Sequence, residues 1–246
     1  MSPLNIAALS LFGVCWLFYQ PLLSRLARRG GAINTDLTVI RGAWMRNMAR
    51  RENRFMDGQI LAQALNSASF FASSNLLLIA GAAGALFNGD ATFRHVSSLE
   101  VIQTSSRLLF EGQLGLVVLT LARGLLDFIW AIRQMNYTLA AIGSVPEDIE
   151  DAGHQLFGDL VARLLNPALS SFSAGVRGYY FALAAGAWLF GPVPFILATA
   201  SAVSILLWRQ RLSPAALAIA DLRQALEQHV HTRGEKSRSE PPIGAP

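Results

Sequence analysis

Long apolar runs, separated by short polar segments, make up most of this 246-residue chain. The longest runs cover roughly residues 4–23, 62–87, 114–133, 167–190 and 195–208. About 20 apolar residues are needed for a helix to cross the hydrocarbon core of a bilayer, and most of these runs reach that length. The pattern therefore predicts an all-α, polytopic membrane protein with about five transmembrane helices. The last two would form a tight hairpin, because Gly191-Pro192-Val193-Pro194 breaks the helix between them.

A second kind of pattern, with apolar residues on one side only, predicts helices outside the membrane. In residues 35–55 the apolar side holds Trp44 and Met48, and the opposite side holds the basic residues Arg46, Arg50 and Arg54. Such a helix either lies at the cytoplasmic headgroup level or packs on neighbouring cytoplasmic helices. At the end of the last run, Trp208 and Arg209 are typical of a membrane interface.

Local signals predict where several helices begin. A capping box, Ser97-x-x-Glu100, precedes the third run, and Ser144-x-x-Glu147 with Pro146 predicts the start of an amphipathic helix. The acidic residues 147–151 in its first turn would face either solvent or the basic stretch 46–54. An Asn166–Pro167 pair predicts the start of the fourth span. We expect one transmembrane domain over residues 1–212, then a cytoplasmic helix from 213 to about 230 and a disordered tail to residue 246.

Composition and charge agree with a membrane protein and indicate its orientation. Apolar residues make up 52% of the chain and charged residues 15%, and the mean hydropathy is +0.38, which is too apolar for an ordinary soluble domain. The net charge of +4 comes from arginines at the ends of apolar runs, so we expect no nucleic-acid partner. With five spans, 16 basic residues fall on one side and two on the other. The positive-inside rule then places the N-terminus outside and the C-terminus in the cytoplasm.

Three ionisable residues interrupt the apolar runs, and they are the candidate site. Arg123 and Asp127 lie four residues apart on one helix face, and Arg177 interrupts the next run. Asn75 has a similar estimated depth, so all four side chains are expected in one buried polar cluster, with a direct ion pair between Asp127 and Arg177. Charged groups at membrane depth cost about 3 kcal/mol on insertion scales and usually face a protein interior.

Three interpretations of this cluster remain open. It could be an ion-pair network that only holds helices together. Alternatively, two arginines against one aspartate leave a spare positive charge, which would suit an anion, a lipid phosphate or a proton-coupled step. In the third interpretation, Arg177 extends toward the cytoplasmic headgroups.

Four strings of sequence resemble an uncharacterised family of bacterial and plant membrane proteins, catalogued as domain-of-unknown-function family 599. The strings are WMRNMARRENR (residues 44–54), FFASSNLL (70–77), WAIRQMNYTLAAIG (130–143) and RGYYFALAAGAWLFGP (177–192). Ser74-Asn75 departs from the family's threonine-rich pattern, and residues 209–212 depart from its Arg-Arg-Glu-Phe. The resemblance implies a helical membrane protein, here of a bacterial inner membrane, and it implies no activity.

From the sequence we therefore expect a non-enzymatic membrane protein without cofactor or metal. The leading hypothesis is a small transporter, a channel-like protein or a subunit of one, with Arg123, Asp127 and Arg177 lining a polar centre. The alternative is a structural or scaffold protein whose polar cluster only holds helices together. Expected partners are the lipid bilayer, an anionic ligand or lipid headgroup, and further copies of the chain in a homo-oligomer.

Overall fold

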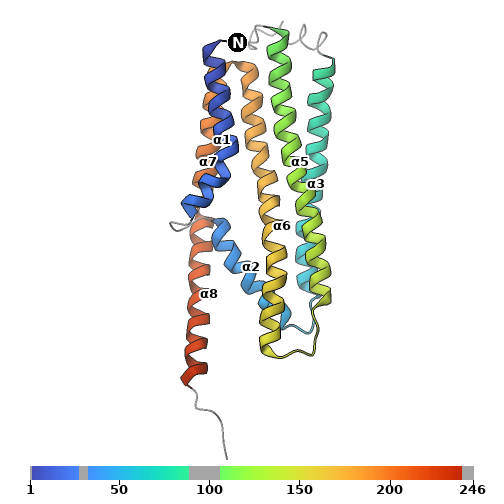
Figure 1. Ribbon diagram of the computed structural model, residues 1–246, viewed down its shortest axis with the longest axis vertical. Coiled ribbons are helices and arrows are strands. Elements are labelled where there is room, and N and C mark those ends of the chain that lie inside the picture. The colour runs from blue at the N-terminus through green and yellow to red at the C-terminus, as the bar shows by residue number, and fades with distance from the viewer. Residues whose placement is uncertain (1, 28–32, 89–105, 240–246) are drawn as a thin grey trace, which may run out of the picture.

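The computed structural model describes residues 2–27, 33–88 and 106–239, and all regular structure in these residues is helical. The helices run side by side along one long axis (Figure 1). In chain order they are α1 (Pro3–Ala27), α2 (Ile33–Ala49), α3 (Phe55–Phe87), α5 (Arg107–Ser144), α6 (Asp151–Gly186), the short 3-10 helix η1 (Ala187–Phe190), α7 (Pro192–Arg211) and α8 (Pro214–Ser239). The all-α class is thus confirmed.

The bundle has two layers, each with its own hydrophobic core. The upper layer contains α1, α7, η1 and the adjacent parts of α3, α5 and α6, and its core includes Phe12, Trp188 and Phe195. The lower layer contains α2, α8 and the opposite parts of α3, α5 and α6, and its core includes Met45, Met135 and Leu165. At ~1.5 Å per residue, the 38 residues of α5 extend for ~57 Å, which exceeds the ~30 Å of a bilayer core. One layer can therefore cross a membrane while the other projects from it.

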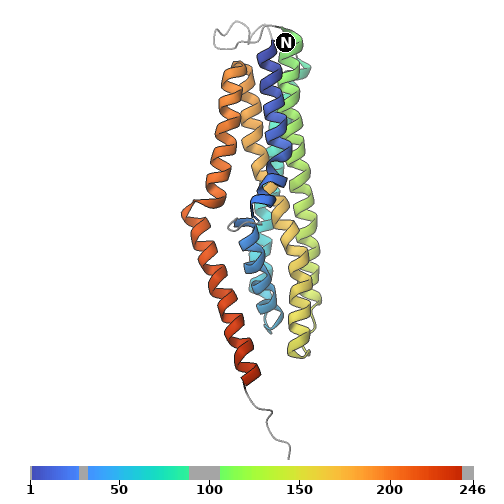
Figure 2. The same ribbon diagram turned by 60° about the vertical axis from the view of Figure 1, so that its left-hand side comes forward.

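Apolar helices of sufficient length identify the chain as an α-helical membrane protein. Among the described residues, three stretches are long and apolar enough to cross a bilayer: Phe55–Phe87, Arg107–Ser144 and Pro192–His229. A shorter apolar stretch covers Pro3–Tyr19 in α1. Figures 1 and 2 show α1, α3, α5, α6 and α7 passing one another in the upper layer. The number of five spans itself stays a prediction.

The helix start predicted at Asn166–Pro167 is wrong, because α6 runs through it without a break from Asp151 to Gly186. Proline in a helix interior removes one backbone hydrogen bond. Here Leu165 and Ala168, on either side of the pair, are 0% exposed and belong to the lower core. The burial of Leu165 and Ala168 outweighs the tendency of the Asn166–Pro167 pair to start a new helix, as tertiary packing commonly outweighs local preferences.

The start predicted at Ser144 is also wrong. Helix α5 continues to Ser144, whose hydroxyl donates back to the Ala141 carbonyl at 2.9 Å and so caps no new helix. Helix α6 begins only at Asp151. At the C-terminal end, α8 extends to Ser239, beyond the limit of about 230 expected from sequence. The capping box Ser97-x-x-Glu100 lies outside the described residues.

The hairpin break predicted at residues 191–194 is present. Gly191 has φ of 112°, a region that favours glycine. Pro192 then opens α7, where the missing N–H costs nothing. As a result α7 returns alongside α6 and α1 (Figure 2).

Candidate functional site

Arg123, Asp127 and Arg177 line one cavity between α1, α5 and α6, with a volume of about 130 Å³. Since a water molecule takes ~30 Å³ in the liquid, the cavity has room for roughly four waters or a small anion. Measured along the helices at ~1.5 Å per residue, Arg123 lies ~24 Å from the upper end of α5. By the same measure Tyr19 of α1, which also lines the cavity, lies ~24 Å from Pro3. Arg123 and Tyr19 therefore lie at the same depth, and the cavity that they line is near the lower boundary of the upper layer.

The charges in this cavity are not paired as predicted. Asp127 pairs with Arg123 on its own helix, with Nε and Oδ2 3.4 Å apart. The expected direct ion pair between Asp127 and Arg177 is not formed. Among the described residues Arg177 makes no hydrogen bond and no direct ion pair, although the residue is only 7% exposed; Asp127 attracts it only at longer range. One guanidinium therefore remains available inside the cavity.

Tyr19 is a cavity residue that the sequence reasoning missed. It is 4% exposed, and its hydroxyl has no hydrogen-bond partner in the described structure. Its ring packs edge-on against Phe181 at 6.1 Å, which holds it on the α6 side. The signal in the sequence is spacing: Asn5, Phe12 and Tyr19 recur every seven residues, so they share one face of α1. All three are buried.

Asn75 is near the cluster but does not line the cavity. Its Nδ2 donates to the Leu121 carbonyl at 2.9 Å and so ties α3 to α5. A side chain at Gly124 would meet that same Nδ2 at 3.3 Å. Gly124 does line the cavity, so Asn75 lies behind the cavity wall. In this position it acts as a helix-to-helix tie and has no direct access to a ligand.

Two glycines set the distance between the helices that carry the charges. A Cβ at Gly178 would lie 3.3 Å from the Gly124 Cα, so the backbones of α5 and α6 cross in close contact here. Small residues allow such close crossings of membrane helices. The crossing brings Arg123 and Asp127 next to Arg177, which comes directly before Gly178.

The sequence that forms this cavity matches the model of a known family. The family model for proteins of unknown function DUF599 matches residues 7–215. The chain belongs to the DUF599 family. No curated protein and no solved structure matches the chain. The match includes every cavity residue and extends to the first residues of α8.

The arginines predicted at a membrane interface make ion pairs and hydrogen bonds within the lower layer of this DUF599 protein, and their position at an interface stays a prediction. Arg46 pairs with Asp159 at 2.9 Å and Arg50 with Asp151 at 3.8 Å, both across to α6. A Cβ at Gly158 would lie 2.5 Å from the Arg46 Cα, so α2 and α6 are in close backbone contact. Helix α2 thus packs on neighbouring helices, and its placement at the cytoplasmic headgroup level stays a prediction. The acidic start of α6 does face the basic stretch, through Asp151.

Arg54 and Trp44 complete this lower framework. Arg54 donates to the carbonyls of Val145 and Pro146 at the turn between α5 and α6. The Trp44 indole donates to Asp57 Oδ1 at 2.6 Å, so this tryptophan serves a helix contact.

The remaining two interface residues lie at the lower end of α7. Trp208 is 53% exposed, and Arg209 donates to the Tyr180 hydroxyl at 2.5 Å. The interfacial role of both stays a prediction.

Proposed function

We propose that this DUF599 protein is a small transport or channel-like membrane protein, or a subunit of one, whose cavity between α1, α5 and α6 binds an anion. The observation that supports this is Arg177, which is buried in the cavity wall and makes no direct ion pair or hydrogen bond among the described residues. A buried charge that a distant carboxylate compensates only in part still carries a desolvation cost. A bound anion would compensate that cost, and the Tyr19 hydroxyl beside it could donate a hydrogen bond.

The pairing within the cavity argues against the alternative, a scaffold role for the cluster. A cluster that holds helices together needs ion pairs between helices. The direct pair found here, Arg123–Asp127, joins two residues of α5, and the attraction between Asp127 and Arg177 of α6 acts only at longer range. Neutral hydrogen bonds connect the helices of the upper layer instead: Trp188 Nε1 donates to Asn5 Oδ1 at 2.8 Å, and Gln113 Nε2 donates to the Trp188 carbonyl at 2.9 Å.

The exposure of the two arginines suggests a route into the site. The Arg123 side chain is 62% exposed and Arg177 is 7% exposed, so Arg123 stands at the mouth and Arg177 at the floor. An anion would first meet Arg123, which Asp127 holds in place, and then Arg177. We propose no catalytic step, and we take the protein to be non-enzymatic.

An Arg177→Gln variant tests the proposal. Glutamine keeps hydrogen-bonding capacity and removes the charge. In vesicles containing the purified protein, we expect measurable flux of chloride or inorganic phosphate, and its loss in the variant. Arg133→Gln is the matched control, because Arg133 is an exposed residue of α5 that contacts Tyr137 and does not line the cavity. If the parent moves and binds neither anion, or if Arg177→Gln leaves flux unchanged, the proposal is wrong.

Orientation is the second part of the proposal. We place the protein in a bacterial inner membrane, and the 16-to-2 distribution of basic residues supports an orientation with the N-terminus outside and the lower layer in the cytoplasm. In a Cys15→Ser background, a cysteine introduced as Gln224→Cys on the exposed surface of α8 should resist a membrane-impermeant maleimide in intact cells. Rapid labelling from the periplasm would reverse this orientation.

A further inference from the structure

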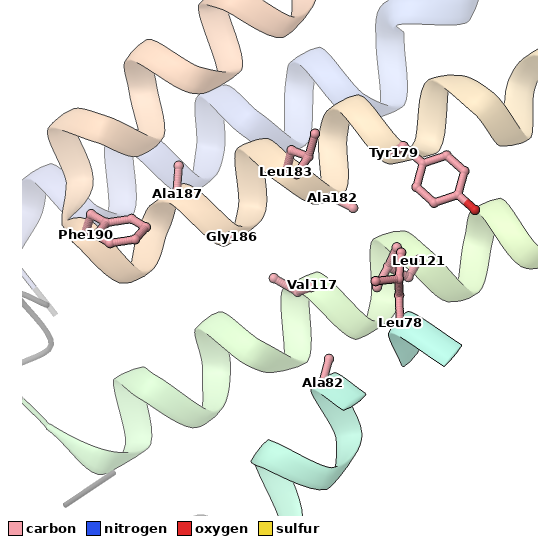
Figure 3. A pocket seen from close by; sticks show the side chains of 10 residues that line it. All are labelled: Leu78, Ala82, Val117, Leu121, Tyr179, Ala182, Leu183, Gly186, Ala187 and Phe190. Atoms are coloured by element: carbon pink, nitrogen blue, oxygen red, sulfur yellow. The ribbon is translucent and has the colours of Figure 1, made fainter. Parts of the chain in front are cut away.

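A second, larger cavity lies on the other side of the α5–α6 crossing. Its volume is about 490 Å³, and its walls come from α3, α5, α6 and η1 (Figure 3). The wall residues used below are Leu78 and Ala82 of α3, Leu121 of α5, and Tyr179, Gly186 and Phe190 along α6 and η1. All of these belong to the upper layer (Figure 1). The polar cavity opens beside α1, whereas this one opens beside α3.

The groove lies between α3 and α6, which both pack on α5, and above a polar contact that joins α3 to α6. That contact is the hydrogen bond from the Tyr179 hydroxyl to the Phe71 carbonyl at 2.8 Å. Above it, the facing residues are small: Ala82 on one wall and Gly186 on the other. A Cβ built on Gly186 would meet nothing within 4 Å, so the wall leaves real space there.

The described residues of the lining offer a ligand almost nothing but hydrocarbon. Tyr179 is the one residue with a polar side chain among the described residues that line the groove, and its hydroxyl already donates to Phe71. A polar ligand would lose its own hydrogen bonds on entering and gain none. The occupant must therefore be apolar where it touches these walls.

The dimensions fit a single hydrocarbon chain. From Tyr179 to Phe190 the groove extends for ~18 Å, counted at ~1.5 Å per α-helical and ~2.0 Å per 3-10 residue. That length is close to one leaflet, about 15 Å of hydrocarbon. The volume is also roughly three times the ~150 Å³ that holds one benzene molecule, which corresponds to about 18 carbons.

We infer that this groove binds one acyl chain of a membrane phospholipid from the leaflet on the α6–α7 hairpin side. The ester end of the chain lies near Phe190, and its methyl end lies near Tyr179 and Leu78. This site is independent of the anion site, because the crossing of Gly124 and Gly178 separates the two.

Photolabelling with a defined lipid tests this inference. The protein is reconstituted in phosphatidylcholine vesicles that contain a phosphatidylcholine with a diazirine near the end of one acyl chain. After irradiation, trypsin releases the peptide between Arg177 and Arg209, which carries the α6 wall. We expect label in this peptide near Tyr179, and we expect it to move toward Phe190 when the diazirine is placed near the ester.

Gly186→Leu fills the groove and has a matched control. Labelling of the 178–209 peptide should fall about tenfold, because the leucine takes the space of several methylene groups. Gly112→Leu adds the same side chain at an α5 glycine that also has nothing within 4 Å and does not line the groove. Labelling of this control should stay at the parental level.

Two other outcomes would overturn the inference. The first is equal labelling of the parent and of Gly186→Leu at this wall, which would mean that lipid touches only the outer surface. The second is cross-linking between Cys residues introduced by Ala82→Cys and Leu183→Cys in separate copies, with loss of a dimer in Gly186→Leu, which would assign the groove to a second chain. If Gly186→Leu does not fold, Ala82→Leu on the opposite wall gives the same readout.

Discussion

The two layers of this protein use charge in different ways. In the lower layer, ion pairs join separate elements: Arg46 of α2 pairs with Asp159 of α6, and Arg223 of α8 pairs with Asp36 of α2 at 2.8 Å. The hydrogen bonds from Arg223 to Asp36 and Glu227 also raise the pKa of its guanidinium. In the upper layer, the ion pair at the cavity joins two residues of one helix and leaves Arg177 unpaired.

This difference separates charges that hold the fold from charges that are available to a ligand. An ion pair between elements is lost when the elements separate, so it contributes to stability. An unpaired buried charge contributes nothing favourable to folding and persists only where something else requires it. The lower layer is therefore the framework, and the cavity of the upper layer is the place to look for binding.

The largest effect that follows from this comparison is expected at Asp57. This carboxylate is 0% exposed and accepts hydrogen bonds from Trp44 and Arg51, so it connects α2, the following turn and α3. Asp57→Ala leaves the indole N–H of Trp44 without a partner inside the lower layer. We expect a loss of about 2–4 kcal/mol in the free energy of unfolding. The ion pair between Arg51 and Asp57 contributes only a small share of this loss, because the Arg51 side chain is half-exposed and solvent screens its charge.

Thermal unfolding in detergent micelles measures this loss. Asp148→Ala, an exposed acidic residue in the α5–α6 turn, should unfold like the parent. If Asp57→Ala were as stable as Asp148→Ala, charge would not hold the lower layer, and the comparison would fail.

Sequence alone predicted the elements better than their limits. Apolar runs predicted the helices of the upper layer, and the Gly191–Pro192 break was confirmed because glycine and proline restrict the backbone directly. The Asn166–Pro167 signal failed because its competitor, burial in the lower core, depends on residues far away in the chain. Local patterns carry no information about such contacts.

For the candidate site, sequence placed Arg123, Asp127 and Arg177 together but not their pairing. Depth along a helix can be counted, whereas the direction of a side chain around the helix depends on how α5 and α6 cross. That crossing is set by the contact of Gly124 with Gly178. Tyr19 was missed because an isolated tyrosine in an apolar run reads as an ordinary packing residue, and only its cavity distinguishes it.

Among the described residues of the lower layer, Arg41 is a buried charge without an ion pair. It tests whether an unpaired buried charge lowers the stability of the fold. Its side chain is 8% exposed, its Nη1 has no partner in the described structure, and burial lowers its pKa to about 10. Because the pKa of Arg41 in the folded protein lies below its usual value, the cost of burying the charge is fully present at neutral pH. This cost is lost only as the pH rises above about 10. We expect Arg41→Met to raise the free energy of unfolding by about 1–3 kcal/mol at pH 7.

The same unfolding assay checks this at neutral pH. Arg50→Met serves as the control, since Arg50 pairs with Asp151 and its replacement should not stabilise the protein. A destabilised Arg41→Met would show that this charge has a partner in the folded state and belongs to the framework after all.

The smallest expected effect compares one exposed ion pair from each layer by double-mutant cycles. For Arg46→Gln with Asp159→Asn, we expect a coupling energy of about 0.2–1 kcal/mol, since both side chains are partly exposed. This coupling should fall when salt is raised from about 0.1 to 1 M, because the Debye length shortens from about 10 to 3 Å.

For Arg123→Gln with Asp127→Asn, the partners lie four residues apart on α5, and such pairs contribute about 0.2–0.5 kcal/mol. The two energies alone do not distinguish the layers, so the cycles should be repeated with the anion that the protein binds. Anion should change the Arg123–Asp127 coupling and leave the Arg46–Asp159 coupling as it was. A coupling above about 2 kcal/mol for the cavity pair without any anion would instead make it part of the framework.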